Sequence, residues 1–306
     1  MIFKKLKAKA WTSAQIRKNN RVTTPINCEA FIHPQDKLTL DSLKKIPLLE
    51  TVCGKILSAL NDSKTEAFTK TDCAQITQKQ FGKIYKMVQS ICNKIGIVIP
   101  KLYLKLDGKT EITTFGATNF TIIIHSGILD KYYDDEIYTM LAHECGHIAC
   151  KHTLYHSAIR FILDGGEFGL KEIGNALNKG GLLGSLVGGA FSLGEDALET
   201  AFLKWLKLSE LSADRIAIIC CNGEQRLIET LMLQEGASRR VIASVNKKSF
   251  IEQAVDYDKE LEKNKVNKAF EFFASKTKDS PMLASRLHEA QKFALSDEYK
   301  TLLKTK

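Results

Sequence analysis

Two histidines four residues apart, with a glutamate directly after the first, form the most informative pattern in the sequence. They are His143, Glu144 and His147, within residues 141–147. Positions four apart share one face of an α-helix, so both imidazoles can bind one zinc ion while Glu144 lies beside the water on that ion. Zinc lowers the pKa of bound water from about 16 to about 7, so a carboxylate can take its proton near neutral pH. The pattern therefore predicts a hydrolytic zinc site that still lacks one protein ligand.

The flanking residues predict that this motif lies on a helix. Asp134 and Asp135 can start a helix, and Glu136 adds a favourable charge near its N-terminus. Apolar residues follow at helical spacing, namely Ile137, Met140, Leu141, Cys145 and Ile148. Gly146 lowers the helix propensity by about 1 kcal/mol relative to alanine, which suggests that another part of the chain approaches the backbone there.

Two segments upstream have the composition of β-strands. Residues 101–106 alternate between polar and apolar side chains, and residues 119–125 contain a run of β-branched side chains. We predict a strand in each segment. An extended peptide can pair with the edge of such a strand through main-chain hydrogen bonds that do not depend on its sequence.

The missing ligand is expected on a second helix within residues 201–221. Glu210 interrupts the apolar stripe of this helix, which consists of Leu203, Leu206, Ala213 and Ala217. A carboxylate that faces a core costs several kcal/mol unless it is paired or binds a metal, so zinc is a suitable partner for Glu210. Asp214, one turn further on, can then accept the second N–H of a ligating histidine. The alternative is a partly exposed Glu210 that forms surface ion pairs with Lys207 or Arg215.

The order and spacing of these residues resemble the HtpX and CAAX-prenyl-protease type of zinc metallopeptidase, the gluzincins of metallopeptidase family 48. The matching motifs are residues 143–147 and residues 210–215, and the resemblance extends over residues 79–225. Phe115 and Gly116 are similar to the edge strand of the family. The resemblance implies an α+β, mostly helical fold, with a zincin-like catalytic core that contains a small mixed sheet and a pair of zinc-binding helices.

The resemblance also assigns roles to individual residues. It implies that His143, His147 and Glu210 bind one Zn²⁺ ion, that Glu144 is the general base, and that Asp214 supports a ligand from behind. A prenylated substrate is not expected, because the membrane chamber of those relatives has no counterpart here.

The sequence departs from the family pattern in two places. Residues 111–114 stand where the family often has Asn-Ala before its edge strand. Near the C-terminus, Ser280 stands where the family commonly has a histidine before proline, although Arg286 matches a family arginine. Arg286 or His288 could replace that histidine as a donor to the oxyanion of the tetrahedral intermediate. The alternative is that Arg286 pairs with a buried carboxylate, and both readings stay open.

Length and composition indicate one catalytic domain with helical additions. The chain has 306 residues, of which 44% are hydrophobic, enough to bury a sizeable core. We predict an N-terminal accessory helical segment over residues 1–75, a zinc metallopeptidase core over residues 76–230, and a C-terminal helical segment over residues 231–306 that completes the core.

The cysteine pattern and the N-terminal sequence indicate the cellular compartment of the protein. Eight cysteines are scattered without a C-x-x-C pair, and no apolar stretch typical of a secretory signal follows the basic N-terminus, so we expect a cytoplasmic protein with reduced thiols. Cys150 is one turn after His147 and could approach the metal, but packing is the favoured role.

Residues 180–194, from Gly180 to Gly194, are uncharged and shorter than the roughly 18 residues that span a bilayer. We expect a lid over the cleft or a loop that touches a membrane, with a buried helical hairpin as the alternative.

The net charge of +9 invites a nucleic-acid interpretation. Lysine and arginine are spread along the chain without a recognised nucleic-acid fold, so solvated surface is the preferred meaning and no nucleic-acid partner is expected. A minor hypothesis is that the basic N-terminus rests on an anionic membrane.

These patterns together predict a zinc endopeptidase that acts on peptides or unfolded proteins, as in protein quality control. The rival hypothesis from another class is a non-enzymatic, zinc-stabilised scaffold or holdase that binds exposed peptide without cutting it, which the missing histidine at Ser280 makes plausible.

Overall fold

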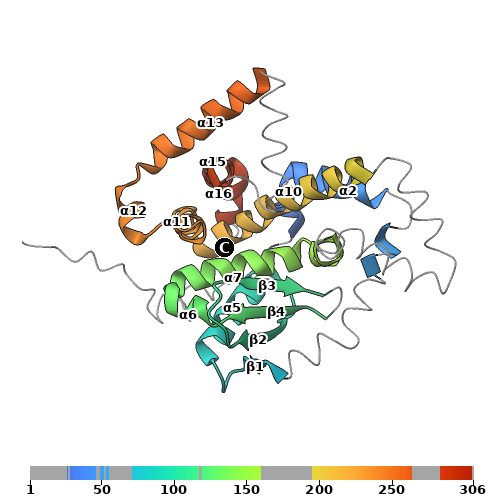
Figure 1. Ribbon diagram of the computed structural model, residues 1–306, viewed down its shortest axis with the longest axis vertical. Coiled ribbons are helices and arrows are strands. Elements are labelled where there is room, and N and C mark those ends of the chain that lie inside the picture. The colour runs from blue at the N-terminus through green and yellow to red at the C-terminus, as the bar shows by residue number, and fades with distance from the viewer. Residues whose placement is uncertain are drawn as a thin grey trace, which may run out of the picture.

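The computed structural model describes residues 26, 28–45, 49–51, 53–54, 71–116, 119–159, 195–263 and 283–304, which form a mostly helical α+β fold with one small mixed sheet (Figure 1). This confirms the predicted fold class. The strands are β1 (Cys73–Gln75), β2 (Lys101–Lys105), β3 (Ile112–Phe115) and β4 (Thr121–His125). The helices are η1 (Cys28–Ala30), α2 (Pro34–Lys44), α5 (Gly82–Ile95), α6 (Gly127–Lys131), α7 (Asp134–Ala149), α10 (Glu195–Cys221), α11 (Gln225–Gln234), α12 (Arg239–Ser244), α13 (Lys247–Lys263), α15 (Leu283–Leu295) and α16 (Asp297–Lys304).

The sheet has the strand order β1-β2-β4-β3. β2 and β4 are parallel, and the two outer pairs are antiparallel. All five residues of β4 are buried, as expected for a run of β-branched side chains in a strand with neighbours on both sides. Among the described strands, β3 forms the edge that lies against α7 (Figure 1).

This topology corrects the position of the strand edge that a peptide could use. The strands predicted within residues 101–106 and 119–125 are present as β2 and β4, but both lie inside the sheet and have strands on either side. Their main-chain groups are therefore already paired. The edge beside α7 belongs to β3, whose last residue is the Phe115 of the family resemblance.

Helix α7 is anchored firmly at its N-terminus. Glu136, which is only 1% exposed, accepts a hydrogen bond from the backbone N–H of Tyr133 at 2.7 Å. Arg239 donates to both carboxylate oxygens of Glu136, at 2.6 and 2.8 Å, and its guanidinium carbon lies 3.7 Å from the centre of the Tyr133 ring. Paired and hydrogen-bonded, the buried Glu136 charge fixes the start of the helix that carries the two histidines.

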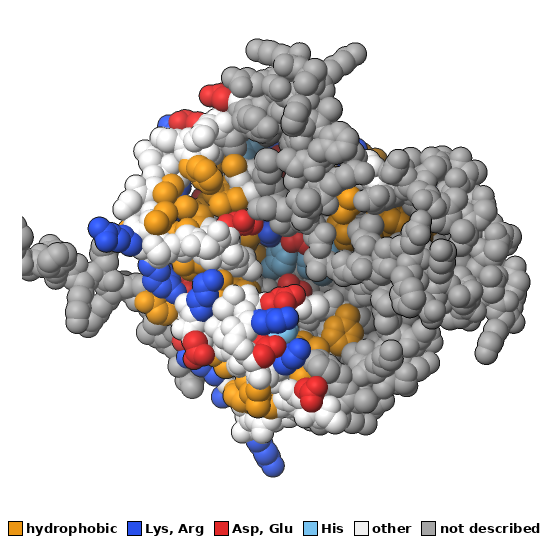
Figure 2. Space-filling model, in the orientation of Figure 1, with side chains coloured by type: hydrophobic (Ala, Val, Ile, Leu, Met, Phe, Trp, Pro, Cys, Tyr) orange, Lys and Arg blue, Asp and Glu red, His pale blue; other side chains and the backbone are white. Residues whose placement is uncertain are grey.

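The core of the described residues consists of two apolar clusters, and α10 contributes to both. The larger one joins the sheet to α5, α7, α10, α11 and α15. The smaller one lies where α2 packs on α10, and its members include Leu40, Leu43, Trp205 and Leu206. Because α10 belongs to both clusters, it is held from two sides. On the side of the molecule seen in Figure 2, histidine side chains lie near the middle of the surface, with acidic and basic side chains next to them.

Several expectations concern residues outside the described ones. They include Ser280, the connector of residues 180–194 and the basic N-terminus. Within the described part of the chain, no helix is both long and apolar enough to cross a bilayer. The cysteines whose side chains are described are all free thiols, namely Cys53, Cys73, Cys92, Cys145, Cys150, Cys220 and Cys221.

Candidate metal centre

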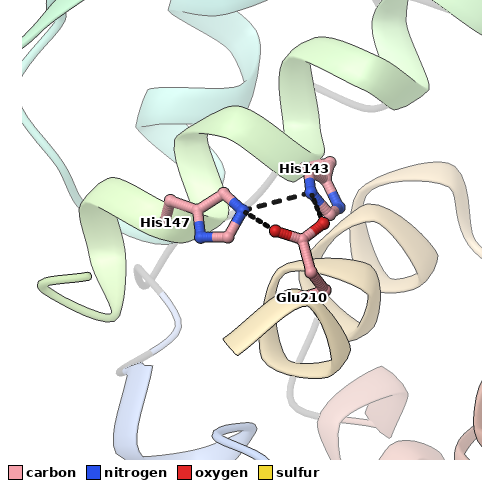
Figure 3. A group of neighbouring side chains, drawn as sticks. All are labelled: His143, His147 and Glu210. Carbon is pink, nitrogen blue, oxygen red and sulfur yellow. Dashed lines mark hydrogen bonds and ion pairs between the residues drawn. The ribbon is translucent and has the colours of Figure 1, made fainter. Parts of the chain in front are cut away.

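Three side chains from α7 and α10 converge on one buried point (Figure 3). His143 Nε2 and His147 Nε2 are 3.1 Å apart. Glu210 Oε2 lies 3.3 Å from His143 Nε2, and Glu210 Oε1 lies 3.4 Å from His147 Nε2. The side chains of all three residues are at most 11% exposed. The four-residue spacing places both imidazoles on the face of α7 that meets α10, and Glu210 reaches them from the opposite helix.

This arrangement fits a zinc ion. Two imidazole nitrogens and one carboxylate oxygen are a common protein ligand set of catalytic zinc, which leaves a fourth position open. Both Nε2 atoms face the carboxylate because the Nδ1 atoms are occupied elsewhere, by Asp214 for His143 and by His152 for His147. Lone pairs that point at one another repel unless a cation or a proton lies between them, so the geometry calls for positive charge.

The pKa shifts of the three side chains also indicate that positive charge belongs between them. Burial lowers the pKa of His143, but its hydrogen bonds to Asp214 and Glu210 outweigh burial and raise the pKa to about 10. Burial lowers the pKa of His147 to about 4, and the charge on His143 contributes to this shift although Glu210 opposes it. Burial raises the pKa of Glu210, but the two histidines lower it well below its usual value. Without a metal, the proton held by His143 thus supplies the positive charge between the three side chains, and a metal ion can take its place only when that proton leaves.

Asp214 and Arg286 support the ligand His143 from behind. His143 Nδ1 is 2.9 Å from Asp214 Oδ1, the contact of a ligating histidine whose other nitrogen donates to a carboxylate. Arg286 grips the same carboxylate with Nε at 2.8 Å and a terminal nitrogen at 2.6 Å. That terminal nitrogen is also 3.7 Å from Glu210 Oε2. Of the two readings left open for Arg286, the structure shows the pairing with a buried carboxylate.

Two further histidines, which the sequence motifs do not include, lie near the centre. His152 Nδ1 lies 3.1 Å from His147 Nδ1, and His156 Nε2 lies 2.8 Å from Ser209 Oγ and 3.9 Å from Glu210 Oε1. The signal that could have found them is the recurrence of histidine five and nine residues after His147, close enough in sequence for both side chains to return to the metal site. Cys150 is not a member of the described ligand group.

A cavity of about 110 Å³ opens beside the centre. His143, Glu144, Glu210 and Arg286 line its polar side. Its apolar side is lined by Ile112, Met140, Leu227 and Leu231, and the remaining lining residues are Thr139, Thr230 and Gln234. The cavity thus connects the ligands and Glu144 to the first residue of the edge strand β3. His288 is not among the lining residues.

A helix-borne pair of histidines, a glutamate from a second helix and a cavity that exposes Glu144 define the centre of a metallopeptidase of the gluzincin type. The sequence comparison agrees: the chain belongs to Peptidase family M48, whose profile matches residues 78–292. The protein is accordingly a metalloprotease, a hydrolase of peptide bonds.

Individual relatives are distant. The chain is 22% identical over 281 residues to the plastoglobule-localized metallopeptidase 48, chloroplastic, of Arabidopsis thaliana, a match that covers 91% of this chain and 76% of the relative. It is 29% identical over 80 residues to a protease HtpX homolog of Bacteroides fragilis strain YCH46, which covers 26% of this chain and 25% of that protein. No solved structure matches the chain.

Proposed function

We propose that the protein is a zinc-dependent endopeptidase in which His143, His147 and Glu210 hold one Zn²⁺ ion and Glu144 is the general base. The observation that carries the proposal is the convergence of the three ligand atoms, which lie within 4.8 Å of one another although they come from two helices. A zinc ion bound there supplies Lewis acidity, which lowers the pKa of a water and polarises a carbonyl oxygen.

The residues of the chain supply the proton transfers. Glu144 follows the ligand His143 directly and lines the cavity, so its carboxylate can take a proton from the attacking water and deliver it to the departing amine. Asp214 keeps a proton on His143 Nδ1 and thereby leaves Nε2 free for the metal. Arg286 balances the charge of Asp214 and holds its orientation through two hydrogen bonds. Arg286 also lines the cavity, and Asp214 takes only two of its five N–H groups, so a donor role toward the oxyanion is compatible with this pairing.

Two features support an extended peptide as the substrate. The edge strand β3 lies beside α7, where a peptide can add to the sheet by main-chain pairing. The cavity of about 110 Å³ has an apolar side formed partly by Ile112 and Leu231, which suits an aliphatic side chain. Most extended segments of a folded domain are already paired within its own sheets, so we propose unfolded protein or flexible peptide as the substrate and protein quality control as the setting.

The location is a further part of the proposal. Free, buried thiols such as Cys92 and Cys145 suit the reducing cytoplasm. The name of the Arabidopsis thaliana relative places that protein at plastoglobules. We propose a cytoplasmic protein whose basic N-terminal segment can contact a membrane surface.

The substitution Glu144→Gln tests the mechanism. The variant should bind zinc as the parent protein does, because Glu144 is not a ligand, and should lose at least about 10³-fold in cleavage of a mixed library of unfolded peptides. Glu252→Gln, on the exposed face of α13, is the matched control and should cleave normally. Zinc content is measured by elemental analysis and turnover by mass spectrometry.

Two outcomes would contradict the proposal in different ways. A Glu144→Gln variant that still cuts would remove Glu144 as the base. Zinc-loaded parent protein that binds unfolded peptide and never cleaves it would favour the non-catalytic scaffold or holdase.

A further inference from the structure

We propose that Asp36, on the N-terminal helix α2, positions the metal ligand His147 through His152. The inference rests on the proposed zinc site. It extends the metal centre to a helix that lies outside residues 78–292, the part of the chain that matches the family.

A continuous line of polar contacts leads from the ligand to α2. His147 Nδ1 is 3.1 Å from His152 Nδ1, and His152 Nε2 is 3.0 Å from Asp36 Oδ2. The side chains of His152 and Asp36 are both 0% exposed. Water from bulk solvent therefore cannot take the place of either group, so the charge of Asp36 acts on His152 Nε2 at close range, although the angle at this nitrogen is not that of a hydrogen bond.

The positions of the protons follow from the contacts. When His147 uses Nε2 for the metal, its Nδ1 carries the hydrogen and donates it. His152 Nδ1 must then accept, because two N–H groups cannot face each other. A neutral His152 consequently carries its proton on Nε2, the ring nitrogen that lies 3.0 Å from the carboxylate of Asp36. Asp36 thus selects the tautomer of His152, and His152 selects the tautomer of His147 that can bind metal.

Asp36 itself is held in place by α10. The indole N–H of Trp205 donates to Asp36 Oδ1 at 3.0 Å, and the hydroxyl of Ser212 donates to Oδ2. Burial raises the pKa of Asp36, but His152, Ser212 and Trp205 outweigh burial and lower it, so the carboxylate stays ionised. An ionised, immobile acceptor is what the His152 tautomer needs.

Each of the two ligands on α7 therefore has a buried carboxylate behind it, one in direct contact and the other through a second imidazole. His143 reaches the buried carboxylate of Asp214 directly, at 2.9 Å. His147 reaches the buried carboxylate of Asp36 through one intervening imidazole. In both cases a carboxylate behind the ligand holds the proton on Nδ1 and leaves Nε2 to the metal, so Asp36 and His152 are positioning residues.

The substitution Asp36→Asn is expected to reverse the tautomers. The indole of Trp205 can only donate, so it keeps the amide oxygen at the Oδ1 position and turns the amide NH₂ toward His152. His152 Nε2 must then accept, its proton moves to Nδ1, and that proton faces the N–H of His147. The hydroxyl oxygen of Ser212, which already accepts from the backbone N–H of His33, has a second lone pair that can accept from the amide, so the contact between α2 and α10 can be kept.

Zinc affinity, measured by competition with a chromogenic chelator, tests the proposal on the full chain. Asp36→Asn should weaken binding by about 10 to 100-fold and should change the visible absorption of the Co²⁺-substituted protein. Asp41→Asn, on the exposed side of the same helix, should leave both readings unchanged. Affinity of Asp36→Asn within threefold of the parent protein would overturn the proposal.

A second background separates positioning from packing. In His152→Asn, the amide oxygen takes the place of Nδ1 as acceptor for His147 and no longer depends on a tautomer. Adding Asp36→Asn to this background should then change zinc affinity by less than threefold. An equal loss in both backgrounds would show that Asp36 acts through packing of α2, which would also overturn the proposal.

The parent protein offers a test that needs no variant. The ¹⁵N shifts of the histidine rings in the zinc-loaded, selectively labelled protein should report a bare Nδ1 and a protonated Nε2 for His152, and the opposite tautomer would refute the inference. Failure of the parent protein to bind zinc would instead refute the proposed function, so the two failures are distinguishable.

Discussion

Gly146 of α7 lies directly against the backbone of Ala213 of α10. A Cβ added to Gly146 would be 2.9 Å from Ala213 Cα and 3.3 Å from its carbonyl oxygen. The contact is one residue before the ligand His147 and one turn after the ligand Glu210. The absent side chain therefore sets the distance between the two helices that must share one metal ion.

We predict that Gly146→Ala weakens zinc binding and destabilises the fold. A contact of 2.9 Å with backbone cannot be relieved by a side-chain rotation, so α10 has to shift. The cost of this overpacking is about 1–3 kcal/mol, which exceeds the gain of about 1 kcal/mol in helix propensity. Urea unfolding and zinc titration measure the two effects. Gly82→Ala, where a Cβ meets nothing within 4 Å, is the control and should be neutral or slightly stabilising.

Removal of Arg286 should destabilise the protein more than removal of an exposed arginine. Arg286→Met leaves the carboxylates of Asp214 and Glu210 buried without their cation, a change that typically costs about 3–5 kcal/mol. The free energy of unfolding is measured in urea with and without zinc, and Arg240→Met on α12 is the control. Normal stability combined with a large loss of turnover would instead indicate that Arg286 contacts the substrate.

Zinc removal should lower the thermal stability reversibly. A ligand that binds only the folded state at about 100 times its dissociation constant adds about 2.7 kcal/mol, which corresponds to several degrees for a chain of this size. Chelation should remove this increment, and added zinc should restore it. Glu210→Gln lacks one ligand, so its melting temperature should respond much less to the same zinc concentration. An equal response would place the bound zinc elsewhere.

The contact between His33 and Glu289 should make stability depend on pH in the acid range. His33 Nε2 lies 3.2 Å from Glu289 Oε2, and this hydrogen bond, together with the nearby Lys292 ammonium, outweighs burial and lowers the pKa of Glu289 to about 2. Because the folded pKa is below the unfolded one, the contact stabilises the fold above pH 4.5 or so and loses its effect as the pH falls toward 2. After solvent screening we expect about 1 kcal/mol.

The measurement compares urea unfolding of the parent protein and Glu289→Gln. The difference between them should be present at pH 6 and should shrink by pH 3.5, whereas Glu252→Gln should show no such trend. A difference that is constant with pH would mean that the contact does not titrate.

The helix of the metal motif and the second helix were readable from the sequence for a local reason. The side chain periodicity of a helix is set by its own backbone, so the acidic start at Asp134 and the apolar positions behind it predict α7, which begins at Asp134. The same periodicity showed that Glu210 stands in an apolar stripe of α10. A carboxylate in such a place needs a partner wherever the helix packs.

Which groups meet across segments was decided only by the tertiary structure. The edge strand is β3 and not β4, because strand order depends on pairing between segments and not on the composition of either. Arg286 pairs with Asp214 because α15 packs on α10. Asp36 reaches His152 only because α2 docks beside Trp205. Sequence periodicity specifies which face of an element is buried, whereas the partner on that face is chosen by how the elements pack together.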